Sequence, residues 1–379
     1  MRNAVIVGYV RSPFTPAAKG ELRKVRPDEL VAQVVKGLIA KTGIDTNDIE
    51  DLILGCAFPE GEQGLNMARL VVFQAGLPIS VAGATVNRFC GSSMSAIHMA
   101  AGAIQMNAGE VFVCAGVESM TRVPMMGFNP MPHPDLYERY PEAYIAMGET
   151  AENVATRYQI TREQQETFAA QSQRRAGEAQ EQGRFRDEIV TIANGGGVIS
   201  LDGCIRPETT AKALAALKPS FDEHGSVTAG TSSPLTDGAA ATLVCSAEYA
   251  KTNGLKPLAA IRSIAVAGCA PEIMGIGPVP ASRKALERAG LSASDIGVAE
   301  VNEAFASQSI AVIRELRLDE SKVNIDGGAI ALGHPLGASG ARITGKAASL
   351  LKREQVTFAL ATQCIGGGQG IATVLEALE

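Results

Sequence analysis

The sequence predicts an α/β protein in which one domain is duplicated and a separate segment is inserted. Three observations lead to this prediction. Strand-like and helix-like runs alternate from the start of the chain, and the same order recurs 247 residues later. Between the two repeats, a segment rich in proline and methionine breaks the pattern. We therefore expect two βαβαβ-type halves packed about a pseudo-twofold axis, with an inserted loop subdomain.

The first half begins with apolar runs that alternate with helical periodicity. Short runs rich in β-branched residues predict strands, and longer runs with apolar residues three and four apart predict helices. This alternation is typical of parallel βαβ units. The predicted strands cover residues 4–10, 51–56 and 111–115, and the predicted helices cover 27–42, 66–74 and 92–106.

The repeat is visible in single residues. The segment G-I-D-T-N-D-I at 43–49 matches G-L-S-A-S-D-I at 290–296, and the same offset moves the strand at 111–115 onto a strand-like run at 358–362. In this register Cys90 aligns with Gly337, in the loop that carries His334. If the halves pack about a pseudo-twofold axis, these loops meet, and the active site lies between the halves.

The middle of the chain predicts an inserted subdomain. It contains five closely spaced prolines, five methionines between residues 120 and 147, and a polar helix at 161–182 with Thr161 as N-cap and Gln164 three residues later. A segment of this length with its own helices indicates a lid or a binding subdomain, although the methionines fit core filler equally well. We expect an N-terminal half at 1–117 plus about 236–257, an insertion at 118–235, and a C-terminal half at 258–379.

Composition excludes several classes of protein. With 379 residues, 46% hydrophobic and 20% charged, the chain is typical of a soluble globular protein of two or three domains. Its net charge of −6, without a basic run, argues against nucleic acid as a partner. The seven cysteines are widely spaced and lack a C-x-x-C pair, which argues against a disulfide framework and a zinc site, and favours a reducing compartment.

No apolar run is long enough to cross a membrane, and the hydrophobic stretch at the N-terminus is too short for a signal peptide. That stretch predicts a buried strand instead.

Three residues are candidates for chemistry. Cys90 precedes small residues and an apolar-periodic run, which places it at the start of a helix. The N–H groups and dipole there favour the thiolate, although a buried structural thiol is the alternative. His334 and Cys364 each lie in a glycine-rich loop, where a histidine exchanges protons near neutral pH and a cysteine acts as an acid, base or nucleophile. The alternative is two glycine-rich turns without a chemical role.

Two further segments fit a binding site or a structural role. Small and hydroxyl residues at 228–240 could border a narrow channel or form a tight junction before a strand. Asn302 follows a strand-like run, where open α/β sheets keep their sites, but asparagine is also a common helix cap. Arg206, taken alone, fits a surface salt bridge.

Taken together, these segments resemble the thiolase family over nearly the whole chain, which implies a thiolase fold. Two other segments, R-P-E-T-T at 206–210 and T-S-S-P-L-T-D-G at 231–238, are closer to bacterial degradative 3-ketoacyl-CoA thiolases than to biosynthetic acetoacetyl-CoA enzymes. The shared blocks are N-R-F-C-G-S-S, G-V-E-S-M, T-A-G-T-S-S, M-G-I-G-P-V-P-A, N-E-A-F, G-H-P-L-G-A-S-G and C-I-G-G-G-Q-G.

The resemblance implies a mechanism with two half-reactions. His334 deprotonates Cys90, whose thiolate attacks the 3-keto carbon of a 3-ketoacyl-CoA. Cys364 protonates the enolate of acetyl-CoA, and CoA, a co-substrate, then takes the acyl group from Cys90. The reverse is a Claisen condensation. No permanently bound cofactor and no metal is implied. One oxyanion site matches His334 with a water held by Asn302, and the other matches the N–H groups of Cys90 and Gly366.

The resemblance also implies where the substrates bind. One departure is Ala146, where biosynthetic members commonly have a histidine, which weakens the short-chain interpretation. The implied CoA contacts are Arg206 at the adenine, Ser233 at the pantetheine arm, Ala304 and Phe305 along the channel, and Met147 and Met274 at the thioester pocket.

For the assembly, the resemblance implies a homodimer or homotetramer and a complex with a hydratase/3-hydroxyacyl-CoA dehydrogenase subunit, in the cytoplasm of a bacterium. Two alternatives stay open. One is a short-chain acetoacetyl-CoA thiolase, and the other is a non-catalytic acyl-CoA-binding scaffold.

Overall fold

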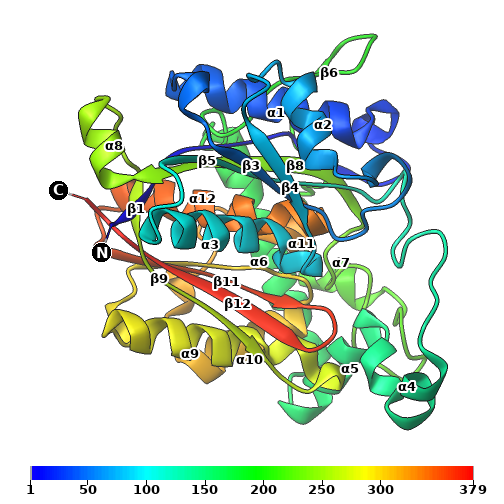
Figure 1. Cartoon of the computed structure of the whole chain (residues 1–379). Coiled ribbons are helices and arrows are strands. Elements are labelled where there is room, and N and C mark those ends of the chain that lie inside the picture. The colour runs from blue at the N-terminus through cyan, green and yellow to red at the C-terminus, as the bar shows by residue number, and fades with distance from the viewer. Residues whose placement is uncertain (1, 379) are drawn as a thin grey trace.

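The computed structural model describes residues 2–378 and contains one large mixed sheet with helices on its faces (Figure 1). Over these residues the sheet has ten strands, nine of them in the order β10-β11-β12-β9-β1-β8-β5-β3-β4, while the short β2 pairs with β8. The strands are β1 (Ala4–Arg11), β2 (Thr15–Pro16), β3 (Asp51–Gly55), β4 (Ala82–Val86), β5 (Val111–Ser119), β8 (Thr236–Ser246), β9 (Ala259–Gly268), β10 (Val298–Val301), β11 (Phe358–Ile365) and β12 (Gln369–Glu376).

The predicted duplication is confirmed by strand order. The first half runs β4-β3-β5-β8-β1, and the second half runs β10-β11-β12-β9. Beside β10, a single parallel bridge pairs Ala299 with Val323, at the position that β4 has beside β3 in the first half. The helices α1 (Pro27–Thr42) and α9 (Pro278–Ala289) are each followed by a capping glycine, Gly43 and Gly290, with φ of 67° and 70°. Both positions need a left-handed residue, which glycine provides without strain.

The parallel pairing that the alternation predicts is present in both halves, but it covers only part of the sheet, which is mixed. β3 pairs in parallel with β4 and β5, and β10 with β11, whereas β8 and β12 are antiparallel to both of their neighbours. A short turn at Gly366–Gly368 joins β11 to β12, and a connection this short can only produce an antiparallel pair. In the first half the inserted segment intervenes between β5 and β8.

Two helices lie between the halves and face each other. These are α3 (Ser92–Gln105) and α12 (Leu336–Arg353), which contact each other and strands of the first half, while α12 also contacts β11 (Figure 1). Their apolar side chains share one buried cluster that includes Met94, Ile97, Ile343 and Leu350. Because each of these helices starts next to a candidate residue, their contact brings Cys90 and His334 toward one another.

The outer faces carry helices that complete each half. α1 and α2 (Met67–Gln74) cover the first half, and α9 and α10 (Ala306–Leu316) cover the second (Figure 1). The remaining helices outside the insertion are α8 (Ala247–Thr252) and α11 (Ala329–Leu332). Among the described residues, no helix is long and apolar enough to span a membrane.

The inserted segment contains four helices and a small hairpin. As predicted, Thr161 caps α6 (Arg162–Glu181) in a reciprocal capping box with Gln164. Of the methionines, Met120 is buried, whereas Met126 and Met131 are exposed, so core filling accounts for only part of the run. The other elements are α4 (Pro134–Arg139), α5 (Met147–Arg157), α7 (Ala211–Ala215), β6 (Ile192–Ala193) and β7 (Val198–Ile199).

Candidate active site

Cys90 lies in a tight turn of 3-10 helix (Phe89–Gly91) directly before α3, where the sequence places it. The preceding Phe89 has φ of 43°, which a bulky side chain rarely adopts. Two side chains, one before and one after Phe89 in the sequence, bind its backbone groups. Phe89 N–H donates to Asn87 Oδ1 at 2.8 Å, and Ser92 Oγ donates to the Phe89 carbonyl at 2.6 Å. The turn therefore presents Cys90, which keeps partial exposure.

The expectation that the helix N-terminus favours a thiolate at Cys90 is wrong for the resting site. Burial raises the pKa of the Cys90 thiol to about 12, and the negative charge of Glu118 acts in the same direction. The main-chain N–H of Gly366 lies against the thiol and partly offsets this rise. Cys90 is therefore a thiol at neutral pH, and it needs a neighbouring base before it can act as a nucleophile.

His334 lies in the loop between α11 and α12 and is a neutral imidazole. Burial, with the nearby positive charge of Arg342, lowers its pKa to about 3. Its Nδ1 is 2.6 Å from Ser339 Oγ, whose own hydrogen is donated to the Pro335 carbonyl. The Ser339 oxygen therefore accepts from Nδ1–H, which leaves Nε2 unprotonated. This tautomer is the one that can accept a proton at Nε2.

Asn302 follows β10 and faces this unprotonated nitrogen. Its Nδ2 lies 3.3 Å from His334 Nε2, and its side chain is fully buried. Within residues 2–378, the Asn302 Oδ1 atom has no hydrogen-bond partner. A buried oxygen of this kind is usually satisfied by water. The alternative role as a helix cap does not apply, because α10 starts at Ala306 and is preceded by Phe305.

Cys364 lies near the end of β11, and Gly366 lies in the turn that follows. Burial raises the pKa of the Cys364 thiol well above its ordinary value, and charge on Cys90 acts in the same direction. On the same strand, Gln363 Nε2 donates to the Cys90 carbonyl. Together with the contact between Gly366 N–H and Cys90, this bond joins the cysteine loops of the two halves.

Most of the expected CoA residues gather around Cys364. Met274, Ala304 and Phe305 share a buried apolar cluster with it, and Met147 packs against that cluster. Ser233 is adjacent, since its N–H donates to the Ala304 carbonyl at 3.0 Å.

Arg206 differs from the other expected contacts, because it lies on an exposed loop outside the apolar cluster. Its N–H donates to Gln173 Oε1 at 2.7 Å. In the part of the chain that the structure describes, its side chain makes no ion pair, so the surface salt bridge considered from the sequence is absent.

Glu118 is a further buried residue at the site; it lies in the G-V-E-S-M block, whose sequence alone does not reveal its role. Its carboxylate accepts from Ala57 N–H at 2.8 Å, from Gly337 N–H at 2.9 Å and from Gln63 Nε2 at 2.8 Å. Gly337 is at the start of α12, three residues after His334. An acidic residue at the end of an apolar strand was the available signal.

Comparison with known proteins agrees with this geometry. The profile of the thiolase N-terminal domain matches residues 4–248, and that of the thiolase C-terminal domain matches residues 255–377. The chain is 51% identical over 383 residues to a 3-ketoacyl-CoA thiolase of Acinetobacter baumannii, covering 99% of this chain and 98% of that protein. It is 49% identical over 389 residues to a 3-ketoacyl-CoA thiolase of Bacillus subtilis, covering 99% and 100%.

Solved structures show the same fold. The crystal structure of human mitochondrial 3-ketoacyl-CoA thiolase superposes with a TM-score of 0.92 at 37% identity, covering 100% of this chain and 99% of that chain. The same human enzyme in complex with CoA also has a TM-score of 0.92 at 37% identity, covering 100% and 98%. The predicted thiolase fold is confirmed, and the chain belongs to the thiolase family.

Proposed function

We propose that the protein is a 3-ketoacyl-CoA thiolase of fatty acid β-oxidation. It cleaves a 3-ketoacyl-CoA with free CoA, and the products are acetyl-CoA and an acyl-CoA two carbons shorter. The observation that carries this proposal is that the Cys364 loop contacts Cys90 through Gly366 N–H and Gln363, while Cys90 packs against a cluster that contains Leu336, two residues after the buried, neutral His334. The names of the relatives above support the same activity.

In the first half-reaction, His334 Nε2 takes the proton of Cys90, and the thiolate sulfur bonds to the 3-keto carbon. The bond between C2 and C3 then breaks, and its electron pair goes to C2 as the enolate of acetyl-CoA. Cys364 donates a proton to that carbon, which leaves the acyl group on Cys90. A carbanion next to a thioester is too basic to leave without such an acid.

Between the half-reactions, the proton on His334 passes to the Cys364 thiolate, which restores both residues. In the second half-reaction, His334 takes the proton of the CoA thiol, and the CoA sulfur bonds to the acyl carbon. The bond from that carbon to the Cys90 sulfur breaks, and the Cys90 thiolate receives the proton from His334. Oxygens that become negative are stabilised at two places: a water held by Asn302 together with His334, and the N–H groups of Cys90 and Gly366. The unpartnered Asn302 Oδ1 and the Gly366 N–H aimed at Cys90 support these roles. Losing one such donor typically lowers the rate about a hundredfold to a thousandfold.

For CoA, we propose that Arg206 lies along the adenine and that Ser233 binds the pantetheine arm, while Ala304 and Phe305 line the channel. Met147 and Met274 border the thioester. The apolar cluster around Cys364 supports the placement of Ala304, Phe305, Met147 and Met274, because all four belong to this cluster or pack against it.

We also propose the larger organisation. The halves are 1–117 with about 236–257 and 258–379, and the insertion at 118–235 carries CoA contacts. The protein acts in the bacterial cytoplasm as a homodimer or homotetramer, and a hydratase/3-hydroxyacyl-CoA dehydrogenase subunit supplies its substrate. The exposed side chains of the inserted loop, among them Met126, Phe128 and Met131, support contact with another chain.

The test is kcat/KM for CoA-dependent thiolysis of 3-ketoacyl-CoA substrates from four to sixteen carbons. We expect activity that holds or rises with chain length. Activity confined to four carbons would assign the protein to the acetoacetyl-CoA enzymes, and an absence of turnover at every length would leave only an acyl-CoA-binding scaffold.

A further inference from the structure

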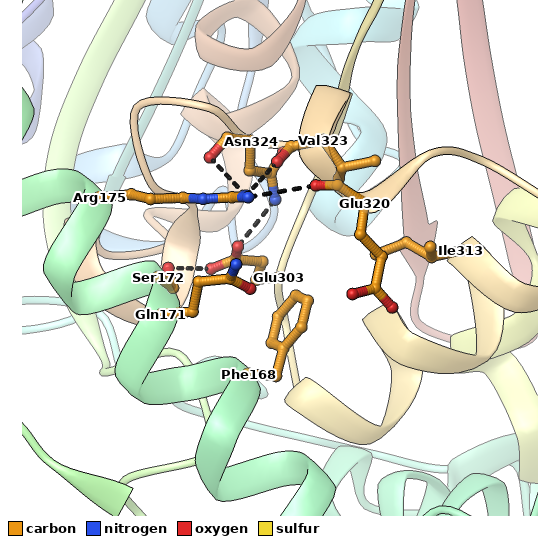
Figure 2. A pocket seen from close by; sticks show the side chains of 9 residues that line it. All are labelled: Phe168, Gln171, Ser172, Arg175, Glu303, Ile313, Glu320, Val323 and Asn324. Atoms are coloured by element: carbon orange, nitrogen blue, oxygen red, sulfur yellow. Dashed lines mark hydrogen bonds between the residues drawn. The ribbon is translucent and has the colours of Figure 1, made fainter.

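Glu303 is a buried carboxylate directly beside Asn302 and makes no ion pair in the described part of the chain. Figure 2 shows its carboxylate between the side chains of Ser172 and Asn324. Its Oε2 accepts from Ser172 Oγ at 2.6 Å and from Ile330 N–H at 3.1 Å, and its Oε1 accepts from Asn324 Nδ2 at 2.8 Å. All three partners are donors, so the geometry fits the ionised form.

Asn324 holds the chain on the other side of Asn302. Its Oδ1 accepts from Val301 N–H at 2.9 Å, and its Nδ2 donates to the Val301 carbonyl at 2.8 Å as well as to Glu303. Asn324 itself has φ of 47°, which asparagine tolerates better than most residues. The residues before and after Asn302 are therefore both bound to one side chain.

Ser172 connects this arrangement to α6 of the insertion. Its Oγ accepts from Gly328 N–H at 3.1 Å, which directs its own hydrogen to Glu303. Gly328 leaves room for the carboxylate, since a Cβ there would lie 2.1 Å from Glu303 Cδ. His334 is held separately, by Thr236 and Ser339.

The cavity beside this network is too small for a substrate. Its volume is about 10 Å³, close to the minimum for one water molecule. Arg175 closes it by donating to the carbonyls of Val323 and Glu320 at 2.6 Å and 3.2 Å (Figure 2). The network is thus a packed support behind the active site, with no room for a ligand.

We infer that Glu303, Asn324 and Ser172, which we call the Asn302 clamp, are positioning residues that fix the Asn302 amide against His334 Nε2. This inference rests on the proposed function. The clamp acts through Asn302, which we assign to the oxygen of the acetyl-CoA enolate. Acyl transfer at Cys90 uses the N–H groups of Cys90 and Gly366 as oxyanion donors and His334 as base, and Thr236 and Ser339 hold His334 without the clamp. A displacement of such a group by about 1 Å can lower a rate on the order of a hundredfold.

Glu303→Gln is the sharpest variant. It keeps the size of the side chain, but its amide NH2 must face either Asn324 Nδ2 or Ile330 N–H. Both of these groups donate a hydrogen bond to the Glu303 carboxylate and cannot accept one from an amide NH2, so glutamine loses a hydrogen bond in either orientation. The matched control is Glu320→Gln, the same chemical change at an exposed residue on the rim of the same cavity.

The experiment compares two rates in the full-length protein. The first is thiolysis of a 3-ketoacyl-CoA, and the second is exchange of labelled CoA into acetyl-CoA, which needs acylation of Cys90 but no carbon–carbon cleavage. For Glu303→Gln we expect kcat for thiolysis to fall about tenfold to a hundredfold, with exchange within about twofold of wild type. Glu320→Gln should leave both rates unchanged.

Equal loss of both rates, or loss of neither, would overturn the inference. If Glu303→Gln does not fold, Ser172→Ala is the second variant. It removes one donor and should produce a smaller loss of the same selective kind, and equal effects on both rates would count against the clamp. An inactive wild type would refute the proposed function instead, so the two failures are distinguishable.

Discussion

The Nδ2 atom of Asn302 lies 3.3 Å from the Nε2 atom of His334, and both side chains are buried. An amide N–H donates to Nε2 only while that nitrogen is unprotonated, which agrees with the lowered pKa of His334. When Nε2 takes a proton from a thiol, this contact must loosen or change. The pair is therefore arranged to hold a base ready in its neutral form.

Cys90→Ser should abolish the acyl-enzyme. A serine hydroxyl has a far higher pKa than a thiol, so its alkoxide is scarcely populated even beside His334. Incubation with an acyl-CoA followed by intact mass measurement should show a covalent adduct in the wild type and none in the variant. Near wild-type turnover in Cys90→Ser would contradict the mechanism.

Cys364→Ala should separate the two half-reactions. The variant keeps Cys90, His334 and the Gly366 N–H, so it should still be acylated by a simple acyl-CoA. It lacks the acid that protonates the enolate, so cleavage and formation of the carbon–carbon bond should both be lost. Mass measurement tests the first part and 3-ketoacyl-CoA turnover tests the second. Equal loss of acylation and cleavage would argue against a separate role for Cys364.

His334 should make the folded state less stable in acid. Its pKa is about 3 in the folded chain, below the ordinary 6.5 of an unfolded histidine. Between these values the unfolded chain binds a proton that the folded chain does not, so stability falls as pH falls from about 6.5 toward 3. One such group contributes at most about 1.4 kcal/mol per pH unit.

Urea unfolding of His334→Asn across this range should therefore show a shallower pH dependence than the wild type. His224→Asn, at a side chain that is 87% exposed, is the control and should leave the slope unchanged. Identical slopes for His334→Asn and the wild type would refute a neutral buried His334.

Arg206→Ala should raise KM for CoA and leave kcat unchanged, because its exposed side chain lies outside the apolar cluster around Cys364. Arg206→Lys distinguishes two kinds of contact. If the flat guanidinium stacks on the adenine, lysine should lose as much affinity as alanine, whereas a simple charge on a phosphate would let lysine restore it. Initial rates at varied CoA concentration measure both variants, and an unchanged KM in Arg206→Ala would remove this residue from the CoA site.

The sequence by itself determined the elements and their repetition. The helix at Pro27–Thr42, the Thr161 cap and the paired glycines 43 and 290 all follow from local rules on periodicity, capping and left-handed backbone. Ordered motifs around Cys90, His334 and Cys364 were sufficient to indicate the family. These features depend on residues close together in the chain, so they can be predicted from the sequence alone.

Only the tertiary structure decided what surrounds those residues. The antiparallel strands, the thiol form of Cys90 and the Asn302 clamp depend on contacts between segments far apart in the chain. Glu118, for example, binds Gly337 across 219 residues. The pKa of Cys90 rises through burial, a property of the packed site that overrode the local preference of a helix N-terminus for a thiolate. Desolvation and long-range hydrogen bonds exist only once the two halves have packed together.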